Sequence, residues 1–216
     1  MKKNNYLIFA HYHSNGLIRD DILEFLRKSN FFFKKIIFIS TNLKINQIKK
    51  FPKSVKIIRR KNIGYDFYSY KHGLNYFILN YLKKDSENAD LYFLNSSVLI
   101  VETNKLIGNL KKLKIKNNEI WGLTKSYELT EHLQSYFFCF SVKVLKNKNI
   151  LNWWLKIKPY KKRQTIIDKY ELGLSKIMKT NDYKLCAMFS KNINIYPKNI
   201  IQKIKLRYKE VLYRQK

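Results

Sequence analysis

The sequence has few cysteines and no long apolar run. Its two cysteines, Cys139 and Cys186, cannot form a disulfide framework, and their spacing fits no metal-binding pattern. The longest apolar runs, such as 6–10 and 36–39, are far shorter than the roughly 20 residues that a membrane-spanning helix needs. The first residues also lack the apolar stretch and the cleavage site of a signal peptide. We therefore expect a reduced protein of the cytoplasm.

Acidic residues are scarce as well. The 216 residues include 44 Lys and Arg against 15 Asp and Glu, which gives a formal net charge of +29. A surplus of this size attracts polyanions and anionic membrane faces. However, the codon bias of an AT-rich genome would explain this composition without any functional role for the charge. The chain contains 37 Lys, 22 Asn and 26 Ile but 3 Ala and 7 Arg. A nucleic-acid-binding module that stacks bases on its many Tyr and Phe rings remains an alternative, although arginine, the better ligand of bases and phosphates, is scarce.

Apolar runs of strand length alternate with helical patterns in the first half of the chain. We expect strands over 6–10, 36–40, 55–58, 90–94 and 120–123, and helices over 17–28, 45–50, 68–82 and 105–113. Because these strand runs lack polar alternation, both of their faces should be buried. The pattern predicts an α/β fold with a mainly parallel central sheet and helices on both faces.

The second half of the chain contains fewer strand signals. We expect strands over 135–141 and 184–189, helices over 150–157 and 165–180, and a basic amphipathic helix over 200–216. The length suits one domain with one core, and the hydrophobic content of 45% argues against disorder.

Polar segments follow four of the expected strands, at residues 11–16, 40–42, 59–67 and 95–97. Parallel sheets bind their ligands beyond the carboxyl ends of the strands. We therefore expect these four segments to meet at one edge of the sheet and to form a binding site there.

The segment after the third strand has the features of a diphosphate site. Gly64 permits a tight turn, and the amides of the following helix, with Arg59 and Arg60 nearby, suit a diphosphate. Asp66 has three possible roles that the sequence leaves open. It could cap the helix, accept hydroxyl groups from a ribose or sugar, or bind a divalent ion.

Two other strand ends carry weaker signals. The fourth strand ends in Asn95-Ser96-Ser97, where many nucleotide-sugar enzymes place a metal-binding Asp-x-Asp, and the serines fit a plain turn or helix cap equally well. His11 follows the first strand, where contacts to a base or ribose are expected, and a turn again explains it equally well.

Residues 131–135 and a later helix supply candidate catalytic groups. His132 beside Glu131 could act as a general base, since the pKa of histidine lies near neutrality. A structural histidine is the competing explanation. Glu171 lies in the middle of a helix, and a solvated surface carboxylate is its usual explanation.

Four blocks of this sequence resemble the rhamnan synthesis F family in content, order and spacing. They are RKNIGYDFYSYKHGL (60–74), DLYFLNSSV (90–98), WGLTKSYELTEHLQSYFFCF (121–140) and YELGLSKIMKTNDY (170–183). The strongest signals are N-x-G-Y-D-F and H-L-Q-S-Y-F. Members are regarded as glycosyltransferases of bacterial surface polysaccharide assembly. The resemblance implies a single Rossmann-like, GT-A-like nucleotide-sugar transferase domain.

The resemblance assigns roles to the residues that match its blocks. The expected donor site comprises Asn62, Gly64, Tyr65, Asp66, Asn95 and Ser97, to which the strand-end reasoning adds His11, Arg59, Arg60 and Ser96. Gln134 and Ser135 are expected to contact the acceptor or the donor sugar, and His132, or else Glu131 or Glu171, to act in catalysis. Ser96 replaces the middle acid of the family's Asn-Asp-Ser motif. A Mg²⁺ or Mn²⁺ cofactor is therefore in doubt, and Asp66 is the remaining candidate ligand.

These expectations combine into one functional prediction. Residues 1–199 form a glycosyltransferase domain, with a nucleotide-sugar-binding half (1–124) and an acceptor or catalytic half (125–199). It transfers a hexose or rhamnose from a nucleoside diphosphate donor to a growing, lipid-linked glycan of rhamnan, O-antigen or capsule type. The helix over 200–216 docks on the inner, anionic face of the membrane. A catalytically inactive scaffold of a polysaccharide assembly complex is the other alternative.

Overall fold

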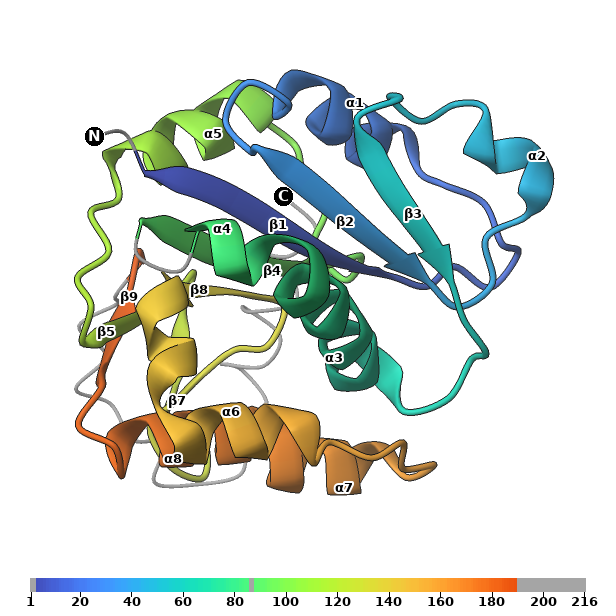
Figure 1. The fold of residues 1–216 in the computed structure, drawn as a ribbon. Helices are drawn as coiled ribbons and strands as arrows, with labels where there is room; N and C mark the ends of the chain where they lie inside the picture. Colours follow the sequence, from blue (N-terminus) through green and yellow to red (C-terminus); the bar gives the residue numbers. More distant parts are fainter. Residues whose placement is uncertain (1–2, 86–87, 190–216) are drawn as a thin grey trace, which may run out of the picture.

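A computed structural model of the protein describes residues 3–85 and 88–189, and these form an α/β fold (Figure 1). Seven strands make one sheet in the order β3-β2-β1-β4-β8-β5-β9. Their bounds are β1 (Asn4–His11), β2 (Lys35–Ser40), β3 (Val55–Arg59), β4 (Ala89–Asn95), β5 (Glu119–Gly122), β8 (Phe137–Ser141) and β9 (Lys184–Ala187). Strands β3, β2, β1 and β4 are parallel, as are β5 and β9, whereas β8 is antiparallel to both of its neighbours. The predicted mainly parallel sheet is therefore confirmed, with one antiparallel strand that the pattern did not reveal.

Two apolar layers explain why the central strands lack polar alternation. On one face, α1 (Asp20–Lys28) and α5 (Thr103–Lys112) cover a core that includes Phe9, Phe38 and Tyr92. On the other face lie α3 (Tyr65–Phe77), α6 (Lys148–Leu155) and α8 (Leu172–Lys179). Their core includes Phe93 and Trp154, whose rings stack with centroids 5.3 Å apart. Both faces of the sheet are thus removed from water, which is what a parallel sheet requires.

Short elements connect these layers. They are α2 (Ile45–Ile48), α4 (Lys83–Asp85), α7 (Arg163–Ile166), the two-residue strands β6 (Lys125–Ser126) and β7 (His132–Leu133), and a 3₁₀ turn at Val142–Lys146. Single π-helical turns, at Ile78–Leu82 and Ile167–Glu171, continue α3 and join α7 to α8.

Several element boundaries differ from the prediction for local reasons. Helix α1 begins at Asp20, three residues later than predicted, because Arg19 is extended and two acids occupy the favourable first turn. Helix α3 begins three residues earlier, at Tyr65, directly after a left-handed Gly64. The last strand ends at Ala187 instead of 189. The paired strands β6 and β7 are too short to leave a sequence pattern. The predicted helix over 200–216 lies outside the described residues.

None of the helices within residues 3–85 and 88–189 has the combined length and apolar character to cross a bilayer.

Gly73 allows α3 to approach β1 closely. A Cβ atom at this position would lie 2.3 Å from Cγ2 of Ile8, a side chain that is completely buried. Because the core has no space to yield, a methyl group here must displace the helix.

We expect Gly73→Ala to lower the free energy of unfolding by about 1–3 kcal/mol, the usual cost of overpacking. Gly108→Ala in α5 is the matched control, because no atom lies within 4 Å of its added Cβ. It should be neutral or stabilising, since alanine is the better helix former by about 1 kcal/mol. Urea denaturation measures both variants, and equal stabilities would show that Gly73 does not limit the helix–sheet distance.

Candidate functional site

The four polar segments that follow β1 to β4 meet at one edge of the sheet. His11 Nδ1 lies 2.9 Å from Ser40 Oγ, which joins the ends of β1 and β2. The backbone N–H of Arg60 donates to the carbonyl of Ser40 at 2.9 Å. The end of β4 joins the same edge through Ser96, whose hydroxyl bonds to the backbone of Tyr12. The expected convergence of strand ends is therefore present.

The turn into α3 requires a glycine. Gly64 has φ 72°, in the left-handed region, and forms the N-terminal cap of α3. A Cβ atom here would also lie 2.7 Å from the Cα of Pro159. Two independent constraints, backbone conformation and close approach, thus select glycine at this position.

The side chain of Arg60 stabilises this turn by hydrogen bonds to its backbone. Its guanidinium donates to the backbone carbonyls of Lys61, Ile63 and Tyr65 at 2.8, 2.5 and 2.8 Å, and to the hydroxyl of Ser69. Burial lowers the pKa of Arg60 to about 10, so the group remains charged at neutral pH. Its hydrogen bonds go to its own loop, whereas Arg59 and Asn62 are exposed.

Asp66 does not cap α3, because Gly64 occupies the cap and no side chain bonds there. Its Oδ2 instead accepts a 2.7 Å hydrogen bond from Nδ2 of Asn95 at the end of β4. Burial raises the pKa of Asp66 to about 6. The hydrogen bond from Asn95 and the charge of Arg60 oppose this shift, and the nearby carboxylate of Glu171 adds to it.

A second polar cluster contains His132, Ser135 and Glu171. The hydroxyl of Ser135 donates to Glu171 Oε2 at 2.5 Å, and Nε2 of His132 lies 3.6 Å from Glu171 Oε1. Nδ1 of His132 lies 2.8 Å from the carbonyl of Thr130. Burial alone would lower the pKa of His132, but the bonds to Glu171 and Thr130 outweigh it and raise the pKa. Glu171 is therefore part of a built cluster, not a solvated surface carboxylate.

Tyr70 connects the two clusters. This buried residue of α3 donates its hydroxyl to the carbonyl of Ser135 at 2.9 Å. Burial and the charges of Asp66 and Glu171 raise its pKa well above the usual value, so it stays protonated. Residues far apart in sequence thus form one continuous polar site.

Glu131 has a different environment from His132. Its carboxylate forms ion pairs with Lys125 and Lys179, both at 2.7 Å. Hydrogen bonds from these two lysines lower its pKa. Gln134 lies beside His132, with Nε2 to Nε2 at 3.5 Å.

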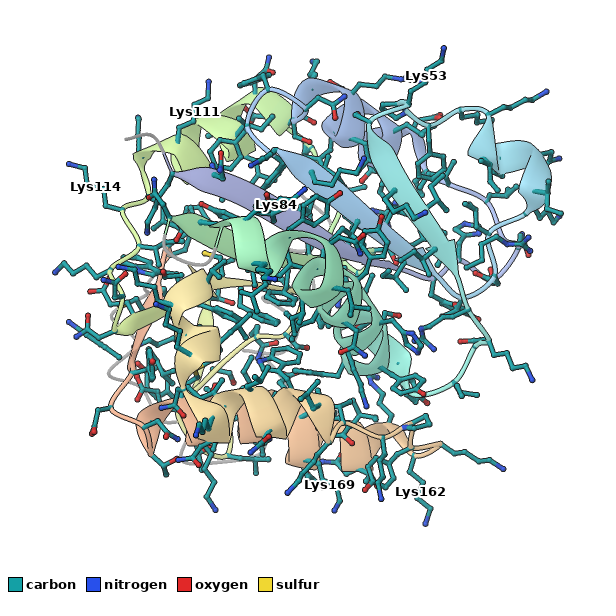
Figure 2. The ribbon with its side chains drawn as sticks, in the orientation of Figure 1. Lys53, Lys84, Lys111, Lys114, Lys162 and Lys169 are labelled. Carbon is teal, nitrogen blue, oxygen red and sulfur yellow. The ribbon has the colours of Figure 1, made fainter. Side chains whose placement is uncertain are left out.

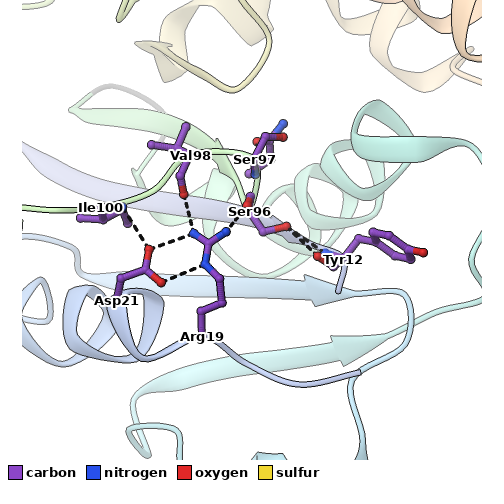
Figure 3. Close-up of polar contacts among 8 residues, drawn as sticks. Tyr12, Arg19, Asp21, Ser96, Ser97, Val98 and Ile100 are labelled. Atoms are coloured by element: carbon purple, nitrogen blue, oxygen red, sulfur yellow. Dashed lines mark hydrogen bonds and ion pairs between the residues drawn. The ribbon is translucent and has the colours of Figure 1, made fainter. Parts of the chain in front are cut away.

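An Arg–Asp pair that the sequence reasoning missed holds the segment after β4 (Figure 3). Arg19 donates to the carbonyls of Ser96 and Val98 at 2.8 and 2.6 Å, and to both carboxylate oxygens of Asp21. Asp21 in turn accepts the N–H of Ile100 at 3.0 Å. Arg19 is the N-terminal cap of α1 and Asp21 lies in its first turn. An arginine and an acid at a helix start are the available sequence signal for this pair, but the same pattern is typical of an ordinary helix start.

The end of β4 is the expected place for a divalent ion. Oδ1 of Asn95 accepts the N–H of Ser97 at 2.9 Å, and its Nδ2 donates to Asp66. The Ser96 hydroxyl is already bonded to Tyr12. Within residues 3–85 and 88–189, no three His, Cys, Asp or Glu side chains lie close enough together to hold a metal ion. Because the side chains of Asn95 and Ser96 are already bonded within the protein, these residues do not fit a divalent cation, which prefers several oxygen ligands.

An open depression of about 550 Å³ lies beside the ends of β1 and β2. Its lining residues are Ser14, Asn15, Gly16, Leu17, Asn42 and Lys44. His11, at the end of β1, is not among these lining residues. Burial, with the nearby His13, lowers the pKa of His11 to about 4, so its ring is neutral at physiological pH.

Residues 36–210 match the model of a protein family described as Rhamnan synthesis protein F. The chain belongs to this family. Among curated relatives, it is 29% identical to the uncharacterized protein y4gN of Sinorhizobium fredii (strain NBRC 101917 / NGR234) over 138 residues, which are 62% of this chain and 35% of that protein. It is 34% identical to virulence protein VirA of Vibrio anguillarum over 97 residues, 44% of this chain and 28% of that protein. The chain thus spans about a third of the length of these relatives.

Solved structures share the fold of this rhamnan synthesis F family member. A 4-diphosphocytidyl-2C-methyl-D-erythritol synthase has a TM-score of 0.54 at 9% identity, covering 96% of this chain and 99% of the other. The mannosyltransferase PcManGT from Pyrobaculum calidifontis, in complex with GDP-Man and Mn²⁺, has a TM-score of 0.52 at 8% identity, covering 99% and 63%. At such identities the similarity shows the fold alone, and it confirms the predicted nucleotide-sugar-transferase architecture.

We expect Asp66 to titrate near pH 6, well above the usual range for aspartate. Because the folded state holds this proton more tightly than the unfolded chain, the contribution of Asp66 to stability is complete below about pH 4 and is lost as the pH rises through about 6. Carboxyl ¹³C NMR measures the midpoint directly. In Asn95→Ala the midpoint should rise further, because a hydrogen bond to the charged form is lost. Asp21, whose pKa the bonds from Arg19 lower despite burial, is the internal reference. A midpoint of Asp66 near 4 would contradict the buried environment.

Proposed function

We propose that this chain is a glycosyltransferase module that transfers a sugar from a nucleoside diphosphate donor to an acceptor hydroxyl. The proposal rests on two polar clusters that meet at the carboxyl edge of the parallel strands. One cluster pairs Asp66 with Asn95, and the other groups Glu171 with His132 and Ser135. Ligands of such sheets bind at this edge. Membership of the rhamnan synthesis F family and the shared fold support the same activity.

The donor occupies the half of the edge formed by β1, β2 and β3. Its nucleoside lies in the depression beside the ends of β1 and β2, lined by residues such as Asn42 and Lys44. Its diphosphate lies near the first amides of α3, where the helix dipole favours negative charge. Asp66 and Asn95 contact the donor sugar, whose hydroxyl groups match a paired carboxylate and amide. Among the neighbours of similar fold, the mannosyltransferase structure contains GDP-Man.

Glu171 is the candidate base that receives the proton of the acceptor hydroxyl. Its side chain is 17% exposed against 6% for His132, so it is the member of the pair that an acceptor reaches. His132 lies behind it and orients the carboxylate, while Ser135 holds its second oxygen. Glu131 is a poorer candidate, because two lysines neutralise it. Gln134 and Ser135 bind the sugar on the acceptor side.

The acceptor is a growing bacterial surface glycan carried on a lipid, with rhamnose or another hexose as the transferred sugar. Family membership supports a polysaccharide product. Attachment to the inner face of the cell membrane would follow from the lysine-rich sequence of residues 200–216.

Nucleoside diphosphate should raise the melting temperature of the protein. At about 100 times Kd the stabilisation is about 2.7 kcal/mol, which corresponds to several degrees for a domain of this size. Asp66→Ala should abolish the shift, whereas Asp168→Ala, which removes an exposed carboxylate in the second half of the chain, should retain it. Differential scanning fluorimetry measures both. Absence of any shift across a panel of nucleoside diphosphates would favour an inactive scaffold.

Glu171→Gln should lower kcat by about 10²–10⁴, the usual contribution of general base catalysis, with the Kd of the donor unchanged. His132→Ala should also lower kcat with little effect on donor binding. Single-turnover transfer assays and donor titrations separate the two quantities. A larger loss in Glu131→Gln than in Glu171→Gln would assign the base to Glu131.

A further inference from the structure

A strongly basic segment, residues 156–163, runs from the end of α6 to the first residue of α7. Five cations occupy eight consecutive residues without an acid: Lys156, Lys158, Lys161, Lys162 and Arg163. All five side chains are exposed. In the part of the chain that the structure describes, none of them forms an ion pair. Five cations close together in the sequence, with no acid among them, raise the local positive potential, so the segment favours a bound anion.

The backbone of this segment is fixed against the start of α3. Pro159 packs on Gly64, and the hydroxyl of Tyr65 donates to the carbonyl of Lys161 at 3.3 Å. On the other side, the hydroxyl of Tyr170 accepts the N–H of Lys158 at 2.7 Å and bonds to its carbonyl at 2.9 Å. Gly64 and Tyr65 belong to the turn that leads into the donor site, so the basic segment forms the rim of that site.

The charge of the segment acts on the site itself. Arg163 is among the groups that oppose the upward shift in the pKa of Asp66, so its guanidinium lies within electrostatic reach of this carboxylate. Two other arginines of the edge are occupied, whereas Arg59 is exposed. Arg60 binds its own loop, and Arg19 is paired with Asp21.

Position distinguishes these cations from the general surplus. Figure 2 shows Lys53, Lys111 and Lys162 projecting from separate parts of the fold, with Lys162 at the tip of the segment beside α7. A single solvated lysine contributes little to any one site. The basic segment is different because its backbone is anchored beside the N-terminus of α3, a 13-residue helix, through Pro159 and Tyr65.

A leaving nucleoside diphosphate carries several negative charges that the protein or a metal must stabilise. The end of β4 does not fit a divalent ion, because Asn95 and Ser96 are already bonded within the protein. We propose that Lys158, Lys161, Lys162 and Arg163 bind the diphosphate of the donor, so that donor binding requires no divalent cation. The inference rests on the proposed transferase function, and it names the group that replaces the metal.

The test measures donor diphosphate binding to the full chain by calorimetry, in EDTA and in Mn²⁺. The probes are inorganic pyrophosphate and the nucleoside diphosphate that gives the largest thermal shift. Wild-type protein should bind in EDTA, with Kd changed less than about twofold by Mn²⁺. Combined Lys161→Ala, Lys162→Ala and Arg163→Ala should raise Kd by about tenfold or more, because charge-assisted hydrogen bonds are lost. The salt dependence of binding should fall as well.

Two controls isolate the position of the charge. Combined Lys111→Ala, Lys112→Ala and Lys114→Ala removes the same charge from the opposite face of the sheet and should change Kd less than about twofold. Replacing Lys161 and Lys162 by arginine should retain binding. An equal loss in both alanine triples would overturn the inference.

The outcome also separates this inference from the proposed function. Binding that appears in Mn²⁺ alone would overturn metal independence and leave the transferase proposal standing. Failure of the wild-type protein to bind any nucleoside diphosphate, with or without Mn²⁺, would overturn both.

Discussion

The hydrogen bond between Asn95 and Asp66 is the interaction on which the candidate site depends. It joins the carboxyl end of β4 to the first turn of α3 and so fixes the helix start against the sheet edge. Asp66 is available for this bond because a left-handed Gly64, and not Asp66, is the N-terminal cap of α3. Arg60 then holds the same turn by its carbonyls. A glycine, an arginine and a buried amide thus meet around this one bond.

Burial of Asp66 raises the pKa of the carboxyl group that accepts this bond. A carboxylate that loses water binds protons more tightly, and the second carboxylate, Glu171, reinforces the effect on Asp66. The protonated hydroxyl of Tyr70 lies between the two clusters and bonds to the Ser135 carbonyl. The site therefore contains two carboxylates in different surroundings, one paired with an amide and one with a histidine and a serine. Such a division would suit the separate roles that we propose toward donor and acceptor.

The sequence predicted those parts of the site that depend on local chemistry. Gly64 was identified from its turn, and the strand ends from the fact that parallel strands share one edge. The pairing of Arg19 with Asp21 was missed, because a helix start beginning with acids looks the same whether or not its arginine reaches a distant loop. The antiparallel direction of β8 was also hidden, since an apolar run of strand length has no direction. Neutralisation of Glu131 by Lys125 and Lys179 likewise required three elements to be placed in space.

The net charge of the chain is likewise known from the sequence, whereas the positions of its cations depend on the fold. A total of +29 predicts attraction to any polyanion and selects none of them. Most lysines are solvated, so water and salt screen them. The basic segment differs in position, because its backbone is anchored by Pro159 against Gly64 and by Tyr170 against Lys158. In the proposed diphosphate site, this position beside the start of α3, more than the composition of the chain, is what would favour a compact, multiply charged ligand.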